Sequence, residues 1–261
     1  MNFSLPHIPD RPARPRDKGV TMVMDKGLSL KQAENFMDAC SDYVDFVKLG
    51  FGTSYITRNL QKKLDLYKEA GIKTYFGGTL FEAFVVRGMF NDYLKLLDKF
   101  KMEVAEVSDG SIVLAHSKKC EFISKLSKDH LVLSEVGSKE EGIIIHPAKW
   151  ISMMKKEIEA GSWKVIAEAR EGGNVGIFHR NGSAHTLLIN KITAKVERER
   201  IIWETPQKSQ QVYFIKLFGA NVNLGNIGFD DVIPLETLRL GLRGDTFFTF
   251  LPKNLEVKTE K

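Results

Sequence analysis

The stretch KVIAEAR, residues 164–170, decides the fold, because it is a short β-branched run that ends beside an acidic residue, Glu168. Two similar runs flank it along the chain: LVLSEV at 131–136 carries Glu135, and RIIWET at 200–205 carries Glu204. The three acidic residues are 33 and 36 positions apart. That spacing fits one strand plus one helix, a unit that returns the chain to the neighbouring parallel strand. The three stretches therefore predict consecutive strands of one parallel sheet.

Outward from this stretch, short β-branched runs alternate with longer amphipathic runs along the chain. Strand patterns lie at 20–25, 44–49, 73–76, 103–107, 131–135, 165–169, 201–204 and 221–224. Helical patterns lie at 29–40, 56–69, 90–100, 117–127, 147–159, 186–196, 210–217 and 233–241. Eight such units without a break in composition predict a single (β/α)₈ TIM barrel over residues 18–261. An open doubly wound sheet is the alternative, since it shares the alternation.

Residues 1–17 differ from the rest, because prolines alternate there with arginines. This composition predicts a proline-rich N-terminal arm with a polyproline-like backbone. The arm is expected either to wrap the barrel or to reach a neighbouring subunit. Together with the aromatic residues Phe247, Phe248 and Phe250 near the other end, it leads us to expect a homo-oligomer.

Composition limits the classes of partner. The chain is 43% hydrophobic and 27% charged, as in ordinary globular proteins, and its net charge is +5. Lysine and arginine are scattered among acids, which argues against nucleic acid and favours small anionic substrates. We expect no membrane association, because no apolar run is long enough to span a bilayer. Cys40 and Cys120 are not spaced as a metal-ligand pair, and no signal-peptide core is evident, so a cytoplasmic location is expected.

In a barrel of this kind, the chemistry lies where the strands end. Glu135, Glu168 and Glu204 would converge there, and like charges at close range repel each other unless a cation holds them. Carboxylate oxygens suit a hard cation, which makes Mg²⁺ the expected cofactor. Alternatively, the three glutamates pair with lysine or arginine in the barrel mouth, or Asp25 or Asp109 replaces one of them.

Other groups at the predicted strand ends could bind substrate anions. Basic candidates for phosphate or carboxylate groups are Lys26, Lys48, Lys139 and Arg170. Lys48 stands out, because it lies inside a strand pattern. Gly77 and Gly78 would let backbone N–H groups approach an anion at a helix start near Thr79, although such glycines often serve only the turn. Asn223, with Asn221 and Asn226 beside it, could donate hydrogen bonds from the last strand, and strand 4 carries Glu106.

Several long strings resemble the phosphosulfolactate synthase family, which also contains plant heat-stress-associated proteins. They are MDKG at 24–27, DYVDFVKLGFGT at 42–53, FGGTLFE at 76–82, LSEVGSK at 133–139, IAEARE at 166–171, NVNLGNI at 221–227 and LETLRLGLR at 235–243. The resemblance runs from about residue 17 to residue 248 and is weakest at 172–200. It implies a (β/α)₈ fold and the Mg²⁺-dependent addition of sulfite to phosphoenolpyruvate, giving (2R)-O-phospho-3-sulfolactate. In methanogens this step opens coenzyme M biosynthesis, and in some bacteria it leads toward sulfolactate.

The implied reaction matches the candidate residues. Attack by sulfite pushes electrons into the substrate carboxylate, and a cation stabilises the charge that develops there. An acid on one face then protonates carbon 2 and sets its configuration. On this hypothesis the three glutamates hold Mg²⁺, while the substrate-binding groups are Lys48, Arg170, Gly77, Gly78 and Asn223. Lys139 is the expected proton donor, with Lys26 as the alternative.

Two other functions remain open from the sequence. A lysine-dependent aldolase-type lyase on the same barrel would use Lys48 or Lys139 as a Schiff base, which requires a lysine with a lowered pKa. A non-catalytic, stress-associated relative would act through its surface. We expect such a relative to have lost the charges at the strand ends, and here they are present.

Overall fold

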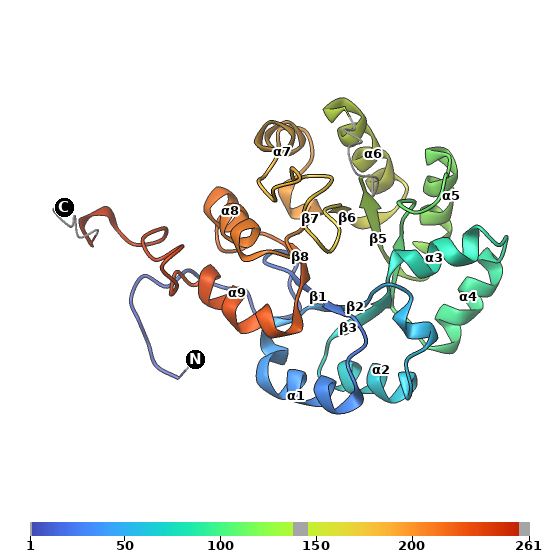
Figure 1. The fold of residues 1–261 in the computed structure, drawn as a ribbon, viewed down its shortest axis with the longest axis horizontal. Helices are drawn as coiled ribbons and strands as arrows, with labels where there is room; N and C mark the ends of the chain where they lie inside the picture. Colours follow the sequence, from blue (N-terminus) through green and yellow to red (C-terminus); the bar gives the residue numbers. More distant parts are fainter. Residues whose placement is uncertain (1, 138–145, 256–261) are drawn as a thin grey trace.

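The computed structural model describes residues 2–137 and 146–255. Eight parallel strands form one sheet in the order β3-β2-β1-β8-β7-β6-β5-β4. β3 and β4, at the two ends of this order, are also neighbours, so the sheet is nearly closed into a (β/α)₈ TIM barrel, as predicted (Figure 1). The strands are β1 Thr21–Asp25, β2 Phe46–Leu49, β3 Lys73–Phe76, β4 Val104–Val107, β5 Leu131–Val136, β6 Ser162–Ala167, β7 Ile201–Glu204 and β8 Leu224–Ile227.

The helices surround the strands on the outside of the barrel (Figure 1). They are α1 Leu30–Cys40, α2 Leu60–Glu69, α3 Gly78–Val85, α4 Phe90–Lys99, α5 His116–Leu126, α6 Pro147–Glu159, α7 Thr186–Thr193, α8 Lys208–Phe218 and α9 Val232–Arg239. Local sequence signals explain where two helices begin: Ser29 caps α1 in a capping box with Gln32, and Pro147 is the first residue of α6. In the described part of the chain, no helix is both long and apolar enough to cross a membrane.

The last strand lies three residues later than the sequence pattern predicted, at Leu224–Ile227 instead of 221–224. The physical reason is the side chain of Asn223, whose Oδ1 accepts a hydrogen bond from Val20 N–H at 3.1 Å. Its Nδ2 donates to the carbonyls of Glu199 and Ile201. These bonds hold the segment before β8 as a turn at the N-terminal end of the barrel.

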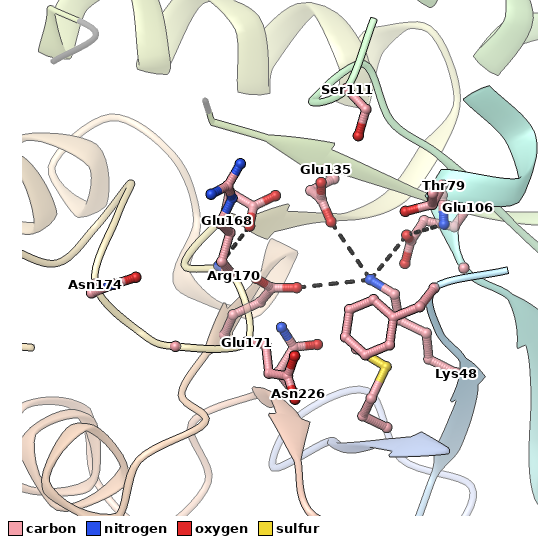
Figure 2. Close-up of a pocket in the computed structure, with 16 residues that line it drawn as sticks. Lys48, Thr79, Glu106, Ser111, Glu135, Glu168, Arg170, Glu171, Asn174 and Asn226 are labelled. Carbon is pink, nitrogen blue, oxygen red and sulfur yellow. Dashed lines mark hydrogen bonds and ion pairs between the residues drawn. The ribbon is translucent and has the colours of Figure 1, made fainter. Parts of the chain in front are cut away.

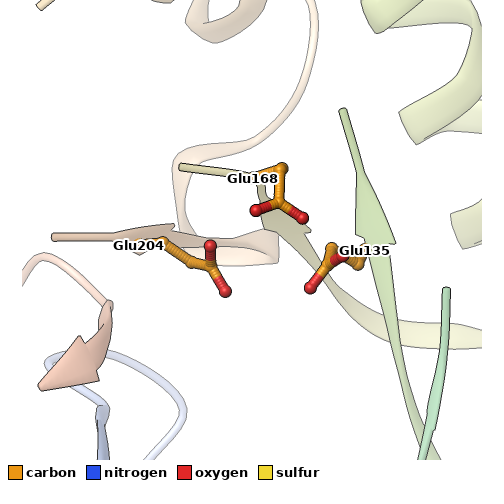
Figure 3. A group of neighbouring side chains, drawn as sticks. All are labelled: Glu135, Glu168 and Glu204. Carbon is orange, nitrogen blue, oxygen red and sulfur yellow. The ribbon is translucent and has the colours of Figure 1, made fainter. Parts of the chain in front are cut away.

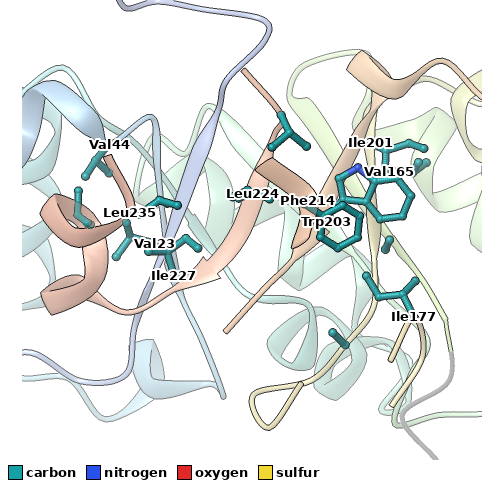
Figure 4. Packing of buried hydrophobic residues seen from close by; sticks show 14 of the residues in the cluster. Val23, Val44, Val165, Ile177, Ile201, Trp203, Phe214, Leu224, Ile227 and Leu235 are labelled. Carbon is teal, nitrogen blue, oxygen red and sulfur yellow. The ribbon is translucent and has the colours of Figure 1, made fainter. Parts of the chain in front are cut away.

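The barrel interior is layered, because side chains two positions apart on a strand point to the same face. Five charged residues point into the barrel near the C-terminal strand ends, and each follows an apolar residue two positions earlier. These apolar residues all belong to one buried cluster: Phe46 precedes Lys48, Val104 precedes Glu106, Leu133 precedes Glu135, Ile166 precedes Glu168 and Ile202 precedes Glu204. A second cluster packs the opposite strand faces against the helices, where Trp203 stacks on Phe214 with ring centroids 4.7 Å apart (Figure 4). An apolar layer inside the barrel thus supports a layer of charged groups at the C-terminal strand ends.

The N-terminal arm packs against its own barrel. Arg11 Nε lies 2.8 Å from Glu236 Oε1, and Arg16 Nε lies 2.9 Å from Asp45 Oδ1. Arg14 donates a hydrogen bond to the carbonyl of Val44 at 3.0 Å. All three arginines therefore contact the body of the same chain, which corresponds to the first of the two arrangements expected for the arm.

Replacing Arg16 with alanine should lower the free energy of unfolding by about 3 kcal/mol, because it leaves the buried carboxylate of Asp45 without its charged partner. Burial already raises the pKa of Asp45, although Arg16 opposes that effect. Urea unfolding followed by circular dichroism measures the loss. Lys31→Ala is the control, since its exposed pair with Glu34 should contribute less than about 1 kcal/mol. Equal losses for the two variants would contradict the buried-pair argument.

Candidate active site

A cavity of about 420 Å³ opens at the C-terminal ends of the strands. Its lining comes from the ends of all eight strands and the segments that follow them (Figure 2). The residues used below are Lys48, Gly77, Gly78, Glu106, Glu135, Glu168, Arg170, Glu171, Glu204 and Asn226. The pocket lies where TIM-barrel enzymes place their chemistry, so it is the candidate active site.

Three glutamates converge in this cavity, as their spacing predicted. Glu135 comes from β5, Glu168 directly follows β6, and Glu204 ends β7. Each can present one carboxylate oxygen within 4.8 Å of the others, and all three are buried (Figure 3). The barrel brings these residues together because each lies at, or within one residue of, the C-terminal end of its strand, and the three strands are consecutive neighbours in the sheet.

The ammonium group of Lys48 lies among the carboxylates (Figure 2). Its Nζ is 3.0 Å from Glu106 Oε1, 3.5 Å from Glu135 Oε2 and 3.8 Å from Glu204 Oε1. Lys48 is only 6% exposed, so these contacts are shielded from water. The sequence offered metal binding and pairing with a lysine as alternatives for the glutamates, and the structure shows that Glu135 and Glu204 do contact a lysine.

Glu106, on β4, is a further carboxylate of the cavity to which the sequence analysis assigned no role. It is fully buried, and its Oε1 also accepts the Gly78 N–H at 2.5 Å. The available signal was the alternation of β4, which places Glu106 two positions after the buried Val104 and therefore inside the barrel. Its acidic side chain in an otherwise apolar strand marks it for the site.

Burial and mutual repulsion perturb the pKa values of this cluster. Burial raises the pKa of Glu106, and it raises that of Glu204 to about 7. Burial lowers the pKa of Lys48, but the carboxylates of Glu106, Glu135 and Glu204 outweigh it and raise this pKa well above its ordinary value. One ammonium does not neutralise the surrounding glutamates, and a divalent cation would relieve their repulsion. The buried carboxylate set therefore fits a hard cation such as Mg²⁺.

The apparent affinity for Mg²⁺ should consequently rise with pH below about pH 7 and level off above it. Below its raised pKa, Glu204 holds a proton that a cation must displace, so the affinity should rise up to tenfold per pH unit. Titration calorimetry at pH 6, 7 and 8 measures this slope. An affinity that does not change across this range would show that Glu204 is not protonated in the free protein.

Arg170 lines the cavity beside Glu168. Its backbone has φ 58°, and its N–H donates to Glu168 Oε1 at 2.6 Å, which fixes the orientation of that carboxylate. Arg170 is exposed as well as lining the cavity, so its side chain could meet an incoming anion. The structure thus adds a main-chain role for this residue to the substrate contact predicted for its side chain.

The two other basic candidates lie differently. Lys26 is half-exposed and is not among the residues that line the cavity, but its Nζ pairs with Glu171, which does line it. Lys26 is much more exposed to solvent than Lys48. Its ion pair with Glu171 makes it less suited to donate a proton to a substrate. Lys139 lies outside the described residues, so its predicted role stays a prediction.

Gly77 and Gly78 both line the cavity at the start of α3. The Gly78 N–H is already taken by Glu106, so the anion at this helix start is a carboxylate of the protein itself. A Cβ on Gly78 would lie 2.2 Å from Ser108 Oγ, which explains the glycine. The helix start expected near Thr79 lies at Gly78, and Glu82 of the same helix accepts hydrogen bonds from Ser108 and Ser111.

Asn223 requires a correction, because it does not line the cavity. Its side chain lies at the opposite end of the barrel, held by the bonds to Val20, Glu199 and Ile201 described above. Asn226, with φ 55° in β8, lines the cavity in its place. The prediction chose the wrong asparagine because it began the last strand three residues too early.

The two aspartates considered as substitute ligands have other partners. Asp25 accepts Lys63 Nζ at 2.8 Å and the Tyr67 hydroxyl at 2.9 Å. Asp109 pairs with the buried Lys119 at 2.9 Å. Neither belongs to the group of carboxylates that can share a cation.

A (β/α)₈ barrel with a charged cavity at its C-terminal end is the architecture of a TIM-barrel enzyme. The family model of (2R)-phospho-3-sulfolactate synthase (ComA) matches residues 9–245, and the chain belongs to this family. It is 40% identical over 250 residues to the phosphosulfolactate synthase of Bacillus subtilis (strain 168), covering 95% of this chain and 99% of that protein. It is 44% identical over 239 residues to the phosphosulfolactate synthase of Methanocaldococcus jannaschii, covering 88% and 94%.

Solved structures with a similar shape share much less sequence. The 3-hexulose-6-phosphate synthase of Salmonella typhimurium superposes with a TM-score of 0.55 at 14% identity, covering 86% of this chain and 100% of that one. At this identity the similarity supports the barrel fold alone.

Proposed function

We propose that this enzyme catalyses the Mg²⁺-dependent addition of sulfite to phosphoenolpyruvate, giving (2R)-O-phospho-3-sulfolactate. The observation that carries the proposal is the convergence of four buried side chains, those of Lys48, Glu135, Glu168 and Glu204, in one cavity. The relatives named as phosphosulfolactate synthases support it, because they match nearly the whole chain. The expected partners are therefore two small anions.

The chemistry of the addition fits this cavity. The sulfur lone pair of sulfite forms a bond to carbon 3, and the carbon–carbon π electrons move toward carbon 2 and the carboxylate. When bound by Glu135, Glu168 and Glu204, Mg²⁺ would supply positive charge where this negative charge develops. A proton delivered to carbon 2 then completes the product.

Lys48 suits a role in binding and stabilising the anionic substrate. Its raised pKa keeps the ammonium protonated throughout the neutral range, so it acts as a fixed positive charge in a site shielded from water. Arg170 at the cavity mouth adds a guanidinium that can bind a phosphate or carboxylate through two hydrogen bonds. Two mutually repelling reactants require such cationic groups to be brought together.

The aldolase alternative needs a lysine that is neutral near pH 7. Lys48 does not meet this requirement, because neighbouring carboxylates stabilise its charged form. A non-catalytic role is opposed by the charged groups that the cavity retains. The addition reaction is therefore favoured over both.

Lys139→Ala should lower the rate of product formation by about 100-fold or more, because this lysine is the proposed proton donor to carbon 2. Binding of Mg²⁺ and the far-ultraviolet circular dichroism spectrum should be unchanged. Lys26→Ala is the matched variant and should retain most activity, since Lys26 is half-exposed and paired with Glu171. Loss of turnover in the Lys26 variant with full turnover in the Lys139 variant would reverse the two roles.

Phosphorus NMR tests the proposed function directly. The protein is incubated with phosphoenolpyruvate, sulfite and Mg²⁺, and the enol phosphate signal should be replaced by that of an alkyl phosphate ester. Adding excess EDTA should stop the conversion. Conversion that needs no sulfite would refute the reaction, and conversion that survives the chelator would refute the metal requirement.

A further inference from the structure

The ammonium of Lys48 is not centred among its three partners. Its shortest contact, 3.0 Å, is to Glu106, while Glu135 and Glu204 lie at 3.5 and 3.8 Å. The two more distant partners belong to the trio that can share a cation, and the nearest one does not. Lys48 therefore lies toward the Glu106 side of the cavity (Figure 2).

Glu106 is itself firmly held. The main-chain N–H of Gly78, the first residue of α3, donates to the same Oε1 that contacts Lys48. Gly78 has no room for a side chain, because a Cβ would collide with Ser108 and lie 2.7 Å from Glu106 Oε1. A close main-chain donor and complete burial fix the position of this carboxylate, so it offers Lys48 a stationary partner.

We propose that Glu106 is a positioning residue that holds the Lys48 ammonium to one side of the cavity, leaving Glu135 and Glu204 available to a divalent cation. This inference rests on the metal site of the proposed function. Like charges repel, so an ammonium that moved between Glu135 and Glu204 would compete with the cation for the same oxygens. Glu106 also keeps Lys48 within the cavity, where it can face a substrate anion.

The proposal makes two opposite predictions for metal affinity. Glu106→Gln removes the charge that holds Lys48, so the ammonium should turn to Glu135 and Glu204 and weaken Mg²⁺ binding by about tenfold. Lys48→Met removes the competing charge, so Mg²⁺ binding should tighten by about tenfold. Glutamine still offers an oxygen to the Gly78 N–H, which preserves the local fold.

Titration calorimetry of Mg²⁺ into the substrate-free protein provides the test, since it does not depend on turnover. The wild type, both single variants and the double variant form a double-mutant cycle. If Glu106 acts through Lys48, then Glu106→Gln should change the affinity by less than about threefold once Lys48 is methionine. Glu106→Asp, which keeps the charge, should restore most of the affinity lost in Glu106→Gln.

Glu103→Gln is the matched control, because this residue lies just before β4, is exposed and pairs with Lys73. Its affinity for Mg²⁺ should equal that of the wild type. Unchanged affinity in Glu106→Gln, or an equal loss with and without Lys48, would overturn the positioning role while leaving the metal site intact. Failure of the wild-type protein to bind Mg²⁺ would overturn the metal site and this inference together.

Discussion

Replacing Lys48 with methionine is expected to lower kcat/KM for the addition of sulfite by about 1,000-fold at saturating Mg²⁺. Removal of one preorganised charge from a water-excluded site commonly has an effect of this size. Lys48 provides such a charge, since it is 6% exposed and held in its charged form by carboxylates. Initial rates followed by phosphorus NMR give the value.

Lys73→Met is the control for this prediction, because Lys73 starts β3 at the far end of the barrel and forms an exposed pair with Glu103. Its rate should stay within about twofold of the wild type. A Lys48 variant that folds normally, binds Mg²⁺ and retains more than a tenth of the wild-type kcat/KM would remove Lys48 from the reaction. Tighter Mg²⁺ binding together with lost turnover would separate its catalytic effect from its competition with the cation.

Glu168→Gln should weaken Mg²⁺ binding by at least about 100-fold, because it removes both a ligand oxygen and a negative charge from the trio. Glutamine retains an oxygen that can accept the Arg170 N–H, so the loop after β6 should keep its conformation. Calorimetry on protein stripped of metal by a chelator measures the change.

The neighbouring Glu171→Gln serves as the control for that variant, since Glu171 is exposed and pairs with Lys26. Its affinity for Mg²⁺ should differ from that of the wild type by less than about threefold. An unaltered Mg²⁺ titration for Glu168→Gln would exclude Glu168 as a ligand. An equal loss of Mg²⁺ affinity in both variants would show that the loss comes from the change in net charge and not from a lost ligand.

The fold and the acidic trio could be predicted from the sequence, because both depend on regular spacing. Residues 164–170 and their two neighbours repeat at the length of a strand plus a helix, and parallel strands place their ends together. Lys48 could be singled out for a related reason: a charged residue within a strand that is otherwise buried needs a partner. In each case a pattern within the sequence was sufficient to predict the position of the residue in the barrel.

The start of the last strand and the partners of Glu106 could not be predicted, because they depend on contacts between distant parts of the chain. The choice of Asn223 over Asn226 was wrong because the start of β8 is set by hydrogen bonds to Val20, Glu199 and Ile201, which no local pattern reveals. The pairing of Glu106 with Gly78 joins residues 28 positions apart. The sequence could place Glu106 inside the barrel but could not identify the partners that fix it.

Diffraction from crystals soaked in Mn²⁺, collected at a wavelength where manganese scatters anomalously, tests the central claim most directly. We expect a single strong anomalous peak within about 2.5 Å of carboxylate oxygens from Glu135, Glu168 and Glu204, with the Lys48 ammonium still beside Glu106. A peak bound elsewhere, or a cavity in which Lys48 alone contacts these carboxylates at saturating Mn²⁺, would contradict it.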